Sequence, residues 1–194
     1  MAITYPLTLP TTGISSVEFR TVNANATSQS PFTFKQQVIS HGGQQLSATV
    51  NLAPMRRAEA SVWKAALISL KGSLGTFLLG DPNYCLPRGT VSSCTLTGSA
   101  GDESGTVVMT GTLKAGDYIQ LGSGSSAKLH QVLVDQDGDG TLELWPALRS
   151  DYTDATVVFN NPKGVFRLSN NVTSWSIDNA SIYGISFEAV EAVT

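Results

Sequence analysis

The sequence predicts a mainly β protein that has one α-helix and carries a small inserted β-barrel. Residues 45–52 alternate strictly between apolar and polar, as in a half-buried strand. Residues 55–70 are the one stretch with convincing helical spacing. Short apolar runs separated by Gly, Ser, Asp and Pro turns fill residues 86–163, and such even spacing without helices is typical of a small barrel or sandwich. We therefore divide the chain into one domain of residues 1–85 and 164–194, and an inserted barrel of residues 86–163.

The composition favours a protein that works through contacts with other proteins. The 194 residues are 41% hydrophobic, which is enough for a real core, and no apolar run reaches the ~18 residues that span a bilayer. No charged-then-apolar leader opens the chain, so we expect a soluble protein without membrane insertion. The net charge of −3 argues against sequence-specific nucleic-acid binding. Only 14% of the residues are charged, so the surface costs little to desolvate against a neighbouring subunit.

The first block predicts a strand at Ile14–Val22, a polar loop over residues 23–31, and then a long hairpin. The hairpin starts at Phe32, reverses at His41-Gly42-Gly43 and returns to Leu52, because glycine accepts the positive φ of a tight turn. One face of the return strand is apolar: Leu46, Ala48, Val50 and Leu52. The other face is polar and uncharged: Gln45, Ser47, Thr49 and Asn51.

A helix should follow from Met55 to Leu70, because Pro54 is tolerated in a first helical turn and Gly72 is a natural stop. Its expected apolar stripe consists of Met55, Ala58, Val62, Ala66 and Leu70, with Trp63 and Leu67 beside them. A short buried strand, Thr76–Leu79, closes the block.

Six short strands are expected in the insertion: Val91–Leu96, Thr106–Thr110, Tyr118–Leu121, Lys128–Val134, Leu142–Trp145 and Thr156–Phe159. The barrel would be attached through Asp81–Arg88 and Asn160–Lys163. Longer alternating strands follow it and contain Val165–Leu168, Trp175 with Ile177, and Tyr183–Ala189. The simplest topology joins these last strands to the first block in one sheet system.

The segment Asp135–Gly140 has carboxylates at alternate positions, which resembles the opening of a calcium-binding EF-hand loop. That loop needs a bidentate Glu at its twelfth position, where this chain has Pro146, and it is flanked by helices rather than strands. We therefore predict a hairpin turn here, because Asp and Gly are common turn residues. A weak calcium site at Asp135–Asp139 is the alternative.

No catalytic motif stands out, and we expect neither an enzyme nor a cofactor. His41 and His130 have no recognisable partner carboxylate in the sequence, which general acid–base catalysis needs. Gly122–Ser125 lacks the lysine and the following helix of a phosphate-binding loop. Cys85 and Cys94 are expected to be free thiols. Trp63, Trp145 and Trp175 each lie in an apolar register and are expected in the core, although such rings could also stack on sugars.

Several segments of the flanking blocks together suggest a family: Phe34-Lys35-Gln36-Gln37 through Leu52, the turn Ala53-Pro54-Met55, Arg57-Ala58-Glu59-Ala60 with Trp63, Leu70-Lys71-Gly72, Gly75–Pro82, Lys163–Leu168 and Tyr183–Ala189. In these segments the chain resembles the distal tail (Dit-like) and minor tail proteins of long-tailed, siphovirus-type bacteriophages. The middle of the chain is less similar.

The resemblance implies a tail-tube-like β-sandwich with one flanking helix and a long hairpin, and a ring of six copies whose hairpins line the DNA channel. Gln45, Ser47, Thr49 and Asn51 would then face the channel. The expected partners are further copies of the chain, the tail tube protein and the tail tip or baseplate hub. The protein would reside in the virion, after assembly in the host cytoplasm. The alternative function is a carbohydrate-binding module that contacts the host surface through the inserted barrel.

Overall fold

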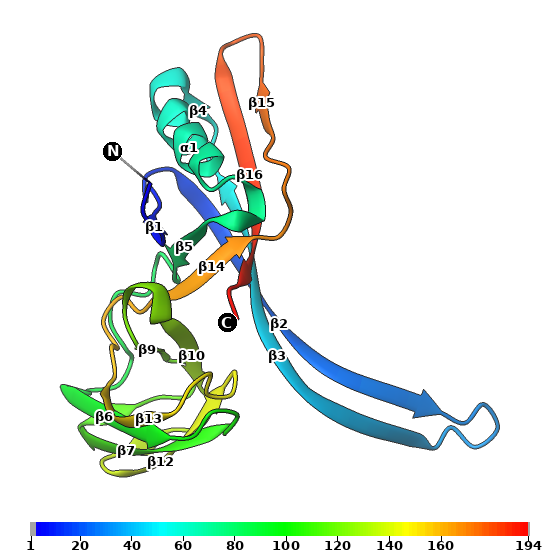
Figure 1. The fold of residues 1–194 in the computed structure, drawn as a ribbon, viewed down its shortest axis with the longest axis vertical. Helices are drawn as coiled ribbons and strands as arrows, with labels where there is room; N and C mark the ends of the chain where they lie inside the picture. Colours follow the sequence, from blue (N-terminus) through cyan, green and yellow to red (C-terminus); the bar gives the residue numbers. More distant parts are fainter. Residues whose placement is uncertain (1–2, 194) are drawn as a thin grey trace.

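The computed structural model describes residues 3–193. They form a mainly β protein with one α-helix, as the sequence predicts, and the strands build a main sheet and a smaller curled sheet (Figure 1). The main sheet contains β1 (Leu7–Thr8), β2 (Ile14–Gln29), β3 (Gln36–Leu52), β4 (Met55–Arg56), β5 (Thr76–Leu79), β14 (Gly164–Leu168), β15 (Trp175–Ile177) and β16 (Ile182–Glu191). Within the described residues, no helix is both long and apolar enough to cross a membrane.

The order of strands in the main sheet is β1-β5-β14-β16-β3-β2, and β4 and β15 pair with the N-terminal end of β16. The last strand of the chain therefore lies at the centre, antiparallel to β3 on one side and to β14 on the other. Both parts of the predicted discontinuous domain contribute strands to this sheet, which is what the alternating pattern before residue 85 and after residue 164 indicates.

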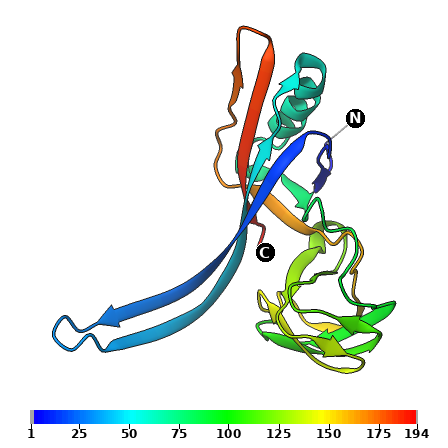
Figure 2. The ribbon, with the colours of Figure 1, turned by 180° about the vertical axis from the view of Figure 1, so that it is seen from behind.

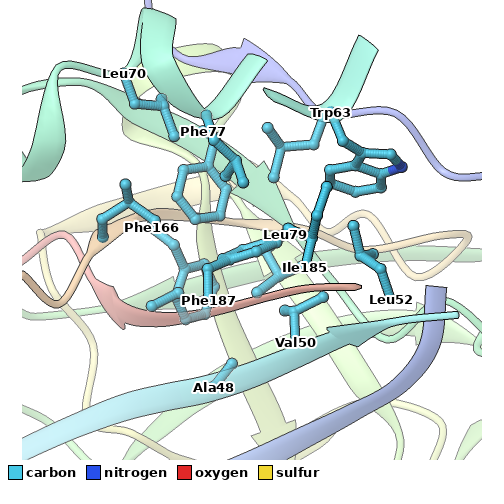
Figure 3. Packing of buried hydrophobic residues seen from close by; sticks show 14 of the residues in the cluster. Ala48, Val50, Leu52, Trp63, Leu70, Phe77, Leu79, Phe166, Ile185 and Phe187 are labelled. Atoms are coloured by element: carbon cyan, nitrogen blue, oxygen red, sulfur yellow. The ribbon is translucent and has the colours of Figure 1, made fainter. Parts of the chain in front are cut away.

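Helix α1 (Arg57–Ser69) packs against the main sheet through Ala60, Trp63, Leu67 and the following Leu70. The predicted stripe is wrong in part, because Val62 is 57% exposed and Ala58 is also exposed. The indole of Trp63 lies 6.1 Å from the ring of Phe187, which also meets the edge of Phe77 (Figure 3). The large Trp63 side chain decides which face of the helix is buried, since aromatic rings contribute the most apolar area. The helix is followed by a 3-10 turn, η1 (Gly72–Leu74).

The long hairpin consists of β2 and β3, and it reverses at residues 30–35 rather than at His41-Gly42-Gly43. The predicted polar loop of residues 23–31 is mostly strand, paired with Gln36–Ser40. Two glycines at this position instead support a bulge, where the register shifts between the pairs Asn23–Gln44 and Asn25–Ser40 and Gly42 has φ of 72°.

The inserted region forms the second sheet, in the order β13-β6-β7-β12-β10-β9. Its strands are β6 (Ser93–Gly98), β7 (Ser104–Thr110), β9 (Tyr118–Leu121), β10 (Lys128–Val132), β12 (Gly140–Trp145) and β13 (Tyr152–Thr156), with a separate small pair of β8 (Thr112–Leu113) and β11 (Gln136–Asp137) and a 3-10 turn, η2 (Gly124–Ser126). The strand predicted at Thr156–Phe159 lies earlier in the chain, at Tyr152–Thr156, so the prediction and β13 share only Thr156.

The second sheet curls into a half-barrel, whose two end regions are bridged at a single residue pair. After β13, Val157 donates a hydrogen bond to the carbonyl of Cys94 on β6, and Val158 exchanges two hydrogen bonds with Gln120 on β9. The interior is apolar and includes Leu96, Val107, Ile119, Leu121, Leu142 and Leu144.

Candidate assembly surface

The four polar residues that the sequence singles out on β3 lie on the side of the main sheet away from the helix. Gln45, Ser47, Thr49 and Asn51 are partly exposed, whereas Leu46, Ala48, Val50 and Leu52 between them are buried. The alternation along this part of β3 is therefore as predicted. That this face lines a channel remains a prediction.

The neighbouring strands add charges to the same face. Thr49 lies between Glu18 of β2 and Glu188 of β16, and Ser47 lies between Arg20 and Val190. Arg20 donates to Glu18 at 3.0 Å, and this neighbour lowers the pKa of the exposed Glu18 carboxyl. The polar residues of β3 thus form the uncharged middle of a face that also carries charges from the neighbouring strands. The acidic side chains flank Thr49, and the basic Arg20 flanks Ser47.

Strand β2 is an open edge. It pairs with β3 along sixteen residues, and within residues 3–193 no strand pairs with its other side. Natural edge strands are usually short or protected by lysine, proline or a covering loop, because their free backbone groups recruit other strands. Strand β2 contains neither Pro nor Lys, and its two charged residues, Glu18 and Arg20, lie near its start. Such an edge is suited to pairing with another chain.

Beyond residue 20 the two strands leave the body of the molecule as an arm, which we define as residues 21–43. Figure 2 shows the arm from behind, curving away from both sheets. Every residue of the arm is exposed except the partly exposed Ser30. An isolated two-stranded ribbon is at best marginally stable in water, because it has no third layer to pack on. The arm also exposes Val22, Val38 and Ile39 at about half or more of their surface.

The tip of the arm, residues 30–35, presents two phenylalanines. Ser30 and Lys35 close it through the Ser30 N–H and the Lys35 carbonyl at 3.0 Å, and Phe34 donates back to the Ser30 carbonyl at 2.9 Å. Phe32 is 91% exposed and Phe34 is 71% exposed. Large apolar side chains that are this exposed on an ordered turn are typical of contact sites.

The barrel holds the base of the arm. Asn23 and Gln44 face each other across β2 and β3, and both are bound by the barrel. Trp145 donates its indole N–H to the Asn23 carboxamide oxygen at 3.0 Å, and the backbone N–H of Ala147 donates to Gln44 Oε1 at 2.6 Å. The bulge at Gly42 lies next to this pair on the side of the arm tip, so the barrel contacts the arm where the register of β2 and β3 shifts.

A buried ionic cluster links the barrel to the main sheet behind these contacts. Arg149 of the barrel binds Glu191 at the end of β16 with two hydrogen bonds, and Glu191 also accepts from the Leu46 N–H. Lys128 Nζ donates to the Ala192 carbonyl at 2.7 Å. Sequence reasoning missed this cluster, since no local pattern relates residues so far apart in the chain.

His130 lies in the same junction and is fully buried. Its Nδ1 is 2.7 Å from the Pro146 carbonyl, so Nδ1 is the donor, and its Nε2 has no hydrogen-bond partner among the described residues. Burial lowers the pKa of His130 to about 4. The imidazole is therefore neutral at physiological pH and serves as a packed, hydrogen-bonded side chain.

The other predicted site residues lie apart. Asp135 accepts from the Ala115 N–H at 2.8 Å and pairs with Lys114, while Asp139 accepts from the Met109 N–H. Strands β10 and β12 pair as an antiparallel hairpin as predicted, but the segment Asp135–Gly140 between them is not a simple turn, because Gln136–Asp137 form β11, which pairs with β8, and Gly140 begins β12. Among residues 3–193, no three His, Cys, Asp or Glu side chains are grouped as metal ligands would be.

The exposure of the remaining candidates is mixed. His41 lies on the exposed arm, next to Gly42. The core assignment is correct for Trp63 and wrong for Trp175, which is 39% exposed and has Lys64 Nζ 5.4 Å from its ring centroid. Trp145 is partly buried against the main core. Cys85 and Cys94 are free thiols, the first exposed and the second buried.

The sequence matches no protein-family model and has no significant match among curated proteins.

Proposed function

We propose that this chain is a structural subunit of a bacteriophage tail, which assembles into a ring, of six copies by the resemblance, at the distal end of the tail. In this role it joins the tail tube to the tail tip, and the ring encloses the channel through which DNA passes. It acts in the virion, and its partners are further copies of itself, the tail tube protein and the tip or baseplate hub. It acts by binding other proteins and catalyses no reaction.

The observation that carries the proposal is the sixteen-residue open edge of β2, which continues into the arm. A monomer gains little stability from the arm, since no side chain of residues 21–43 is buried. The same ribbon is stabilised if it pairs with, or lies against, the next subunit. A contact between two different surfaces of neighbouring copies closes into a ring when the rotation between them allows it.

The outer face of the main sheet supports the placement of a channel. Gln45, Ser47, Thr49 and Asn51 present polar groups that remain hydrated, and the flanking rows contribute acidic Glu18 and Glu188 and basic Arg20 and Arg167. A face with equal numbers of acidic and basic groups attracts a passing polyanion less than a basic face does. Low affinity is what a conduit for DNA requires.

Light scattering and negative-stain images of the purified chain test this function. We expect closed rings, with the chain alone or with the tail tube protein. Val22→Lys places a charge on the outer face of the open β2 edge and should reduce ring formation, whereas Val108→Lys, at a similarly exposed strand position in the barrel, should not. A chain that stays monomeric under both conditions contradicts the proposal.

The alternative of carbohydrate binding by the barrel has less support. Sugar sites usually offer an exposed aromatic face, and the four aromatic residues described in the barrel region after residue 86, Tyr118, Trp145, Tyr152 and Phe159, are all partly buried. We therefore give the barrel the role of a support for the arm.

A further inference from the structure

The exposed tip of the arm has a matching apolar pocket elsewhere on the same chain. The pocket, which we call the Leu9 pocket, has a volume of about 400 Å³ and is lined by Leu9, Pro10, Leu79, Pro82, Cys85 and Phe187, among others. Leu9, Leu79 and Phe187 belong to the core but retain 7–8% exposure, because they form its walls. A pocket with apolar walls and this volume has room for phenylalanine side chains.

We propose that the tip of one copy, through Phe32 and Phe34, docks into the Leu9 pocket of a second copy. The inference rests on the proposed ring and names the contact that links its subunits. Tip and pocket are different surfaces of one chain, so they occur in equal numbers and form a head-to-tail contact. In Figures 1 and 2 the arm points away from β1 and β5, which flank the pocket, so the tip is directed away from the pocket of its own chain.

The charges favour a second copy as the occupant. Lys35 is the only lysine or arginine of the arm and directly follows Phe34. The pocket is lined by one acidic residue, Asp81, whose carboxylate accepts a hydrogen bond from the Asn83 N–H. When Phe32 and Phe34 dock, we expect Lys35 of the tip to pair with this carboxylate of the second copy. The pocket wall also contains one basic residue, Lys163, so the contact we expect for Lys35 is the local one with Asp81 and does not reflect a net negative charge of the pocket.

The chain itself provides a probe for this contact. Cys85 is an exposed thiol in the wall of the pocket, while Cys94 is buried. Thr33→Cys places a second thiol between the two phenylalanines and leaves both rings in place. With diamide as the oxidant, we expect disulfide-linked oligomers up to the closed ring. Thr33→Cys combined with Cys85→Ser should give none, and Ser176→Cys, an exposed position on β15, should not link to Cys85.

Two variants measure the strength of the contact. Phe32→Ser with Phe34→Ser should weaken association at least about tenfold, because burial of a single phenylalanine is worth that much. Thr11→Trp fills the pocket from its exposed wall and should have the same effect, while the exposed barrel position Thr153→Trp should have none.

The outcomes separate this contact from the ring. Rings that form with unchanged affinity in the tip variant, or the absence of the Thr33→Cys ladder, overturn the docking proposal and leave the ring function standing. Linked dimers or open chains without closed rings support the docking contact and contradict the ring.

Discussion

Arg149 and Glu191 form a two-point ion pair across the junction of the barrel and the main sheet. Arg149 Nε lies 3.1 Å from Glu191 Oε1, and Arg149 Nη2 lies 2.7 Å from Glu191 Oε2. The Glu191 side chain is 2% exposed and that of Arg149 is 12% exposed. The pair connects the last strand of the chain to the insertion, so the two regions are joined by charge as well as by backbone and by the packing of Leu129 in the main core.

Removal of one partner of this pair should be more harmful than removal of both. Arg149→Met leaves a buried carboxylate without its counter-charge and should lower the free energy of unfolding by about 3–5 kcal/mol. Arg149→Met combined with Glu191→Gln should recover much of that loss. Urea unfolding at neutral pH measures both. If the double variant is no more stable than the single one, the loss comes from packing rather than from charge.

The buried His130 should make the fold sensitive to acid. Its folded pKa of about 4 lies below the ordinary value of 6.5, so between these two pH values the unfolded chain binds a proton that the folded chain does not. The free energy of unfolding should therefore fall as the pH decreases from about 6.5 to about 4, by about 2–3 kcal/mol in all. The positive charges of Lys128 and Arg149 also disfavour protonation of the His130 imidazole, whereas the negative charge of Glu191 favours it.

The test compares pH profiles of stability. His130→Asn retains a donor for the Pro146 carbonyl and should flatten the profile over this interval, while His41→Asn on the exposed arm should leave it unchanged. Equal slopes in the wild type and in His130→Asn would assign the acid sensitivity to other groups.

A new positive charge should strongly destabilise the fold at one position of β3 and hardly affect it at the adjacent position. Val50 is fully buried, so Val50→Lys places an ammonium group in the core and should cost about 3 kcal/mol or more, or prevent folding. Thr49→Lys introduces the same group on the exposed face between Glu18 and Glu188 and should change stability by less than about 0.5 kcal/mol. Thermal unfolding of the two variants compares them, and equal damage would show that the faces are reversed.

Replacement of residues 86–163 by a short Gly-Ser linker tests the role of the barrel. The ends of the insertion are close, since the Asn161 N–H donates to the Cys85 carbonyl at 3.0 Å, so closing the loop should cost little. The sequence alone suggests that the ring then forms as before. The structure adds that Leu129 leaves the main core and that Glu191 loses Arg149.

We therefore expect a less stable chain that retains the ring, and partial recovery of stability with Glu191→Gln. Negative-stain images and urea unfolding of both shortened chains provide the measurement. Loss of the ring in both, with the folded state intact, would make the barrel part of the subunit contact.

Strong local periodicity is what made parts of this fold predictable. The strand through Val50 and the strands of β5 and β14 alternate or form apolar runs because one or both faces are buried, and that pattern is visible in any short window. The helix was predictable from its spacing, whereas its buried face was shifted by the bulk of Trp63.

The errors have physical causes. Residues 23–29 are Asn, Ala, Thr, Ser and Gln, which have little tendency to form strands alone and are held as a strand by pairing with β3. Gly42 and Gly43 permit either a turn or a bulge, and the sequence does not distinguish them. The ion pair of Arg149 with Glu191 and the hydrogen bond from the Ala147 N–H to Gln44 join segments that are far apart in the chain. A single sequence carries no pattern for such contacts.

The bare ribbon of the arm has a consequence for the lifetime of the protein. The only lysine of the arm, Lys35, lies at the tip, and the residues on both sides of it are exposed. Trypsin should therefore cut an unassembled copy after Lys35 first, since proteolysis begins in exposed segments with few stabilising contacts. A neighbour that covers the tip would block this cut. If the proposed assembly holds, proteases would degrade unassembled subunits and leave assembled ones intact, so only assembled copies would persist.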